Sequence, residues 1–129
     1  MELSESKEDY LEAIYILKQK YGHVRNAMLC DYMNYSKSSI SVAMRVLSED
    51  GYVIRSKYDG ITLTPEGEKI AKKVYERHLL LKEYLEELGI SKEQADIDAC
   101  RMEHVVSDET CQCLQERMDE IRRENEKVM

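Results

Sequence analysis

The sequence predicts a mainly α-helical chain with one β-hairpin, and three observations support this fold class. Apolar residues recur at spacings of three and four along most of the chain, as they do on one face of a helix. One short stretch rich in β-branched residues surrounds an Asp-Gly pair, which is typical of a hairpin turn. Proline occurs once and glycine five times in 129 residues, so few positions interrupt helices.

Two helices are expected before residue 35. The first should cover residues 5–21, because Gly22 lies where a C-terminal cap belongs and an apolar stripe precedes it. The members of this stripe are Tyr10, Ala13, Ile14 and Leu17. The second helix should begin with Asn26 as its N-cap and end near Asn34.

A third helix and a hairpin follow. Ser36 can cap this helix and Gly51 can end it, and two short helices joined by a tight turn suit a helix-turn-helix. Residues 52–57 and 61–64 are expected to form two strands, joined by a turn at 58–60. The sequence therefore predicts a winged helix-turn-helix, with the hairpin as its wing.

A long helix begins with Thr64 as its N-cap and Pro65 as its first residue, and Gly89 ends it. Its apolar stripe consists of Ile70, Val74, His78, Leu81, Tyr84, Leu85 and Leu88. We expect this helix to link two domains: a winged helix-turn-helix at residues 1–72 and a helical domain at residues 73–129.

The helical domain contains two further expected helices. Ser91 starts a capping-box pattern, and the helix it opens should run through His104 and Val105. Ser107 and Asp108 can cap a last helix, which should fray from residue 122 onward because little remains there to bury. Cys30 is expected to be a small buried residue of the second helix, and Cys111 and Cys113 are expected to pack in the core or at a dimer interface.

Composition limits the class of protein. The chain has no Phe and no Trp, so its lean core favours completion by a second subunit and we expect a homodimer. The start of the chain does not resemble an export signal, and no apolar run approaches the ~20 residues that span a bilayer. With four cysteines, these features favour the reducing cytoplasm and no membrane partner.

The net charge of −7 argues against a nucleic-acid partner, but the charge is unevenly distributed. Residues 36–73 hold seven basic and five acidic side chains, a local charge of 7 − 5 = +2. The acidic excess lies in the first helix and in the C-terminal half, where bound dications would offset part of it.

The sharpest chemical signal is the triplet Cys100, Glu103 and His104. On a continuous helix, positions i, i+3 and i+4 share one face, and a thiol, a carboxylate and an imidazole suit a first-row transition metal. The alternative is a buried cysteine beside a surface Glu-His pair. Asp9 and Glu12 also share a helical face, and the alternative for this pair is a solvated acidic face.

The sequence closely resembles the diphtheria toxin repressor family of metalloregulators over essentially its full length. The resemblance rests on the wing ending in Leu-Thr-Pro-Glu-Gly, on Glu76-Arg77-His78, and on the run from Ala99 to Glu109. The length matches the two-domain branch that responds to manganese, which lacks a C-terminal SH3-like domain. The resemblance implies a helical domain that dimerises and binds a metal.

The resemblance also implies the metal ligands, namely Asp9, Glu12, His78, Cys100, Glu103 and His104. Asp9 and Glu12 match the manganese branch, whereas Cys100 matches the iron branch. The expected ion is therefore Mn²⁺ or Fe²⁺, with Zn²⁺ or Co²⁺ as alternatives, and no organic cofactor is expected. At the family's ancillary site, Lys82 stands where a glutamate belongs.

For DNA, the resemblance implies that the helix after Ser36 enters the major groove of a palindromic operator. The residues expected at this interface are Ser36, Lys37, Ser38, Ser39, Ser41 and Arg45 on the helix, with Lys57 and Tyr58 on the wing. Ordinary capping would need Ser36 alone. The helix has no central Gln or Asn to read adenine, so specificity should rest more on DNA shape.

We therefore expect a metal-dependent transcriptional repressor that controls manganese or iron homeostasis and binds its operator once a divalent ion is bound. The first alternative is a metal-independent winged-helix regulator with a helical dimerisation domain. A small metal hydrolase and a protein-protein adaptor are further alternatives. The sequence has no glycine-rich phosphate loop, nucleophile elbow or His-Glu-x-x-His pattern, so we expect no enzyme.

Overall fold

The computed structural model describes residues 3–128, with no account of the side chain at 128. It is mainly helical with a single two-stranded sheet among the described residues, and the expected fold class is confirmed. The chain falls into two compact units whose boundary lies between Lys73 and Val74. No helix of the described part combines the length and the hydropathy needed to cross a bilayer.

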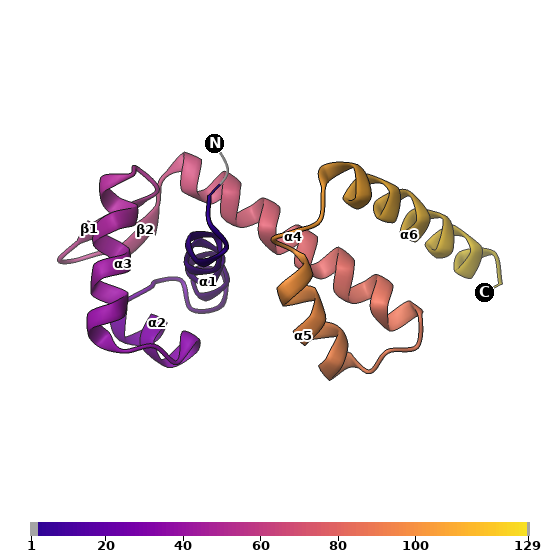
Figure 1. Cartoon of the computed structure of the whole chain (residues 1–129), viewed down its shortest axis with the longest axis horizontal. Helices are drawn as coiled ribbons and strands as arrows, with labels where there is room; N and C mark the ends of the chain where they lie inside the picture. The colour runs from indigo at the N-terminus through magenta and orange to yellow at the C-terminus, as the bar shows by residue number, and fades with distance from the viewer. Residues whose placement is uncertain (1–2, 129) are drawn as a thin grey trace. The chain divides into compact units, whose positions relative to one another are not determined.

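The N-terminal unit places three helices before the hairpin (Figure 1). Its elements are α1 (Glu5–Tyr21), α2 (Asn26–Met33), α3 (Lys37–Glu49), β1 (Val53–Ser56), β2 (Gly60–Leu63) and the first turns of α4 (Pro65–Glu87). They enclose one apolar core, made of Leu11, Ala13, Ile14, Leu17, Val24, Leu29, Ile40, Met44, Leu47, Val53, Ile61 and Ala71. The half-buried Cys30 packs against this core, as expected.

Local capping explains where the first helices begin and end. The hydroxyl of Ser4 accepts the N–H of Lys7 at 3.3 Å, and Gly22 ends α1 with a φ of 81°, so the expected bounds of α1 are confirmed. The expected cap of α2 is wrong, because the extended residue before the helix is Arg25 and Asn26 is already helical. Asn34, with a φ of 58°, ends α2 as expected.

Strand β1 is shorter than the expected 52–57, because the side chain of Ser56 ends it, and β2 begins and ends one residue before the expected 61–64. The hydroxyl of Ser56 accepts the backbone N–H groups of Tyr58 and Asp59 at 3.3 and 3.2 Å, which turns the chain early. Gly60 then pairs with Ser56 and already belongs to β2. Val24 adds a short bridge to this hairpin, since its carbonyl accepts the N–H of Ile61 at 2.9 Å.

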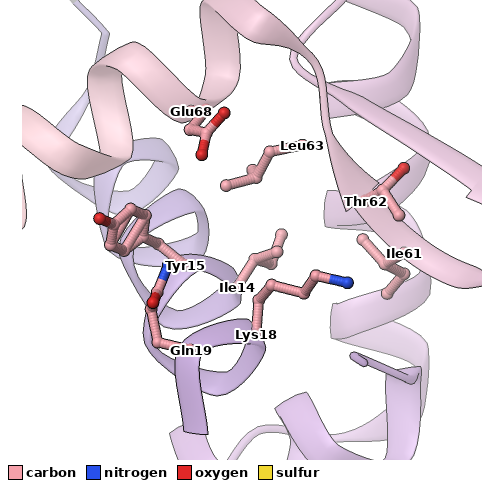
Figure 2. Close-up of a pocket in the computed structure, with 8 residues that line it drawn as sticks. All are labelled: Ile14, Tyr15, Lys18, Gln19, Ile61, Thr62, Leu63 and Glu68. Carbon is pink, nitrogen blue, oxygen red and sulfur yellow. The ribbon is translucent and has the colours of Figure 1, made fainter. Parts of the chain in front are cut away.

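A small cavity of about 160 Å³ lies in the N-terminal unit between α1, β2 and the start of α4 (Figure 2). It is lined by Ile14, Tyr15, Lys18, Gln19, Ile61, Thr62, Leu63 and Glu68. This lining contains neither histidine nor cysteine, so the cavity is not a site for a soft metal ion.

The C-terminal unit consists of the second half of α4, α5 (Lys92–Met102) and α6 (Asp108–Val128), and both later helices pack against α4 (Figure 1). Buried Leu80 of α4 meets Met118 and Ile121 of α6. The half-buried Cys111 packs against this cluster, whereas Cys113 is exposed. The expected fraying of α6 is wrong: the helix continues to Val128, and the Nε of Arg122 donates to Glu83 at 3.1 Å.

Helix α5 ends earlier than expected. Its last residue is Met102, whose carbonyl accepts the N–H groups of both Val105 and Val106, so the chain leaves the helix before His104. Its buried face is formed by Ala95 and Ala99, whereas Ile97 and Cys100 are exposed. The metal-site triplet therefore spans the end of a helix and the turn after it.

We predict that Gly60→Ala will destabilise the N-terminal unit by about 2 kcal/mol more than Gly22→Ala does. Both glycines have a positive φ, but a Cβ at Gly60 would lie 2.3 Å from the carbonyl oxygen of Val24, whereas one at Gly22 would meet nothing within 4 Å. Urea unfolding of both variants measures the difference. Equal losses would show that the contact between Val24 and the wing can relax freely.

Candidate metal centre and nucleic-acid interface

Helix α3 presents polar side chains at its N-terminus. Lys37, Ser38 and Ser39 are exposed and Ser41 is half-buried, while Ile40 on the same turn is buried in the core. The hydroxyl of Ser36 is already used, because it accepts the N–H of Ser39 at 3.1 Å as the helix cap. The serines beyond it are therefore not needed for capping.

Further along α3 and on the wing, three more expected interface residues are exposed. The guanidinium of Arg45 lies 3.5 Å from the carboxylate of Glu49, a weak surface ion pair that a phosphate could replace. Lys57 and Tyr58 occupy the tip of the wing, and Tyr58 is 81% exposed. A large, rigid aromatic side chain left in solvent at a wing tip suits contact with a partner surface.

Arg25 fixes the wing tip, and sequence reasoning missed it. Its guanidinium donates to the carbonyl oxygens of Lys57 and Tyr58, at 3.2 and 2.6 Å respectively. These bonds hold the loop that carries the two expected wing contacts. The only sequence signal was an arginine in a short connection between helices, which does not reveal its partner.

His78 is the centre of the metal-site candidate. It lies on α4 with 9% of its surface exposed, and each ring nitrogen faces a carboxylate. Its Nδ1 lies 2.9 Å from Oε2 of Glu103, and its Nε2 lies 2.9 Å from Oδ1 of Asp96. The ring thus links α4 to α5 and to the turn that follows α5.

Three of the expected ligands come together around this ring. The donor atoms of His78, Cys100 and Glu103 all lie within 4.8 Å of one another. The Glu103 side chain is fully buried and its Oε1 makes no hydrogen bond within residues 3–128, while Nε2 of His104 lies 3.4 Å away from that oxygen. A buried carboxylate oxygen without a hydrogen bond is costly unless a cation completes its shell.

The surroundings of His78 favour its charged form. Hydrogen bonding to the side chain of Cys100 and then to that of Glu103 raises the pKa of His78 from 6.5 to about 11, against the opposing effect of burial. Asp96 acts in the same direction. The metal-free site therefore holds a proton at the place where a metal ion would supply positive charge.

This donor set fits a divalent transition ion. Imidazole nitrogen, thiolate sulfur and carboxylate oxygen together form a borderline-soft set, and the unbonded Oε1 of Glu103 offers a coordination position. Exposure of Cys100 leaves a route to solvent, whereas Glu103 and His78 are buried.

Two family models match the chain almost end to end. Residues 2–61 match the iron-dependent repressor N-terminal DNA-binding domain, and residues 64–127 match the iron-dependent repressor metal-binding and dimerisation domain. The chain belongs to the iron-dependent repressor family. This confirms the resemblance to the diphtheria toxin repressors and the expected regulatory function, since the family consists of metal-dependent transcriptional repressors rather than enzymes.

Individual relatives of this repressor are also transcriptional regulators. It is 36% identical over 102 residues to the HTH-type transcriptional regulator MntR of Lysinibacillus sphaericus, covering 79% of this chain and 73% of that protein. It is 35% identical over 122 residues to an uncharacterized HTH-type transcriptional regulator of Methanocaldococcus jannaschii. This match covers 93% of this chain and 98% of that protein. A manganese-dependent transcriptional repressor solved with manganese superposes with a TM-score of 0.77 at 29% identity, covering 88% of this chain. The repressor spans about half, 52%, of that solved chain.

The repressor's two remaining expected ligands lie on α1. Asp9 is half-buried in the first turns of that helix, and Glu12 is buried on the same face. They belong to the N-terminal unit, whereas His78, Cys100, Glu103 and His104 belong to the C-terminal unit. Their role as ligands stays a prediction.

Arg77 holds the turn of the repressor that carries Glu103 and His104, and sequence reasoning gave it no role. Its Nη1 donates to the carbonyl oxygens of Glu103 and Val106, at 3.4 and 3.2 Å, and its Nη2 pairs with the carboxylate of Asp108. The guanidinium is largely buried, with 17% of the side chain exposed. It therefore braces the chain from the end of α5 to the start of α6.

Asp96 is a second residue of the repressor that the sequence did not reveal. Besides its contact with His78, its Oδ1 lies 3.8 Å from Nζ of Lys82. The ammonium of Lys82 thus faces a carboxylate from α5. Asp96 is 18 residues away from His78, and only the packing of α5 on α4 joins them.

We predict that Arg77→Ala will lower the free energy of unfolding of the repressor by about 3 kcal/mol, because two part-buried carbonyl groups lose their donor. Arg101→Ala, at an exposed position of α5, should change it by less than about 0.5 kcal/mol. Guanidinium unfolding of the metal-free chain measures both. A loss for Arg77→Ala no larger than for Arg101→Ala would contradict the bracing role.

Proposed function

We propose that a divalent transition ion bound at His78, Cys100, Glu103 and His104, with Asp9 and Glu12 as further ligands, activates this repressor to bind DNA. The observation that carries the proposal is the cluster of three donor atoms within 4.8 Å around a fully buried glutamate. The ion would supply a positively charged partner for the Oε1 of Glu103, which is buried without a hydrogen bond.

The proposed ion is Mn²⁺ or Fe²⁺, with Zn²⁺ and Co²⁺ as alternatives. A similar repressor was solved with manganese, and the carboxylates of Asp9 and Glu12 would suit that hard ion. The thiol of Cys100 favours a softer ion, because thiolates bind iron, cobalt and zinc better than manganese. The two preferences oppose each other within one ligand set.

We further propose that the repressor acts in the cytoplasm as a homodimer on a palindromic operator, and controls genes of manganese or iron homeostasis. Helix α3 would enter the major groove through its exposed N-terminal serines and Lys37, with Arg45 one turn further along. Lys57 and Tyr58 would reach the DNA backbone or the minor groove from a wing tip that Arg25 fixes.

Metal would control DNA binding through charge. In the metal-free protein the carboxylates of the proposed ligands would repel one another. An ion that takes ligands from both domains would cancel this repulsion and restrict the movement of one domain relative to the other. DNA affinity then increases because fewer arrangements of the two recognition helices compete with the one that fits the operator. The coupling is reciprocal, so operator DNA should also tighten metal binding.

We expect operator affinity to fall by roughly 10–100-fold when metal is removed by a chelator, a usual size for coupling between two sites. Fluorescence anisotropy with DNA from the gene's own upstream region measures this, with Mn(II), Fe(II) and Zn(II) added back separately. Cys100→Ala should remove most of the metal response. Cys113→Ala, an exposed thiol on α6, is the matched control and should retain it.

An operator affinity that chelation leaves unchanged would reject this proposal. It would favour the metal-independent winged-helix regulator, whose C-terminal domain only dimerises. Binding to no DNA at all, with or without metal, would instead favour an adaptor.

Metal affinity should rise about tenfold per pH unit for each proton displaced, throughout the range from about pH 6 to pH 9. His78 keeps its proton over this range, since its pKa is raised from 6.5 to about 11, and a metal can bind only the neutral ring. An unperturbed imidazole has already lost its proton above about pH 6.5, so it would add nothing to the pH dependence of metal affinity there. Competition with a chelator at several pH values measures the slope.

A histidine elsewhere provides the control for this pH profile. His23→Gln, at an exposed position of the N-terminal unit, should leave the slope of log affinity against pH unchanged. His78→Gln should lower that slope by about one, because one proton fewer is displaced. Calorimetry in two buffers of different ionisation enthalpy counts the released protons directly. A pH-independent affinity for the unmodified chain would exclude His78 as a ligand.

A further inference from the structure

We propose that Asp96 is the positioning residue of His78: it accepts a hydrogen bond from Nε2 and so directs Nδ1 toward the metal, while Lys82 weakens that bond. The inference rests on the proposed function, because it concerns how a proposed ligand is held. It adds two residues, one on α5 and one on α4, that lie outside the ligand set.

The ring of His78 has two distinguishable ends. Its Nδ1 faces Glu103, whose side chain is fully buried and whose oxygens belong to the cluster that includes Cys100. Its Nε2 faces Asp96, which belongs to no group of three or more potential ligand atoms within 4.8 Å of one another among the described residues. Nδ1 is therefore the nitrogen that would give up its proton to an ion, and Nε2 is the nitrogen that would keep its hydrogen.

A histidine that binds metal through one nitrogen usually donates its other N–H to a carboxylate or carbonyl group. That bond selects the tautomer, fixes the orientation of the ring and raises its basicity as a ligand. The contact of 2.9 Å between Nε2 and Oδ1 of Asp96 has the length of such a bond. Asp96 itself is 54% exposed, so its carboxylate can hold charge without the cost of burial.

Lys82 adjusts this bond from the same helix as His78. It lies four residues after His78 on α4, so the two side chains point to the same side of the helix and reach the same oxygen of Asp96. The ammonium, 3.8 Å away, withdraws negative charge from the acceptor. A weaker acceptor makes His78 a weaker ligand, so Lys82 should lower metal affinity through Asp96.

The test uses the full chain with Zn(II) as the probe, titrated against a competing chelator. Asp96→Asn should lower Zn(II) affinity by roughly 10–100-fold, the usual effect of removing such a partner. Asp96→Glu should restore part of it. Asp98→Asn is the matched control, because Asp98 lies on the same helix and accepts a hydrogen bond from Gln94 instead.

Long-range ¹H–¹⁵N NMR of the imidazole rings supplies a readout that stability alone would not change. In the Zn(II)-loaded chain we expect His78 to carry hydrogen on Nε2 and metal on Nδ1. Asp96→Asn should lose this slowly exchanging Nε2–H signal. Metal on Nε2 in the unmodified chain would overturn the proposal, even if the variants failed to fold.

A double-mutant cycle tests Lys82. Lys82→Gln should raise Zn(II) affinity severalfold in the unmodified chain, but by less than about twofold in the Asp96→Asn background. Equal gains in both backgrounds would show that Lys82 acts on the ion directly and would overturn its role. Asp96→Asn binding as tightly as Asp98→Asn would overturn the role of Asp96. A Zn(II)-loaded chain in which His78 binds no metal would reject the proposed function itself.

Discussion

The C-terminal unit depends on one buried imidazole held between two carboxylates. His78 joins α4 to Glu103 through one nitrogen and to Asp96 through the other. The apolar contacts between the same helices are modest, since α5 contributes mainly two alanines to the buried surface. A polar link of this kind sets the geometry of the helices more sharply than small apolar side chains can, because hydrogen bonds are directional.

Directional hydrogen bonds also hold the wing of the N-terminal unit, and most of their acceptors are backbone carbonyl groups. Val24 bonds to Ile61 through its carbonyl, and Arg25 holds the carbonyl groups of the wing tip. Gly60 permits this approach because any side chain there would collide with Val24. The connection between α1 and α2 therefore builds the wing, although 35 residues separate Val24 from the near end of β2 in the sequence.

Much of this could be predicted from the sequence, because the signals are local. Ser36 and Gly22 stand next to the helix ends they define, and the three clustered donors lie in motifs of a known family. The end of α5 could not be predicted, since residues 103–106 are compatible with a helix. Arg77 donates to the carbonyl groups at both ends of that segment, and a tertiary contact of this kind produces no periodic pattern in the sequence. Asp96 was missed for the same reason.

Exposure of Cys100 beside two buried donors has a kinetic consequence. An ion held only by buried groups can leave only when the protein opens, which makes its release slow. A ligand at the surface can be displaced first by water or by a thiol from solution, and the remaining bonds then break in turn. Occupancy of the proposed centre would therefore follow changes in the free ion concentration in both directions, so the repressor would respond to the loss of metal as promptly as to its arrival.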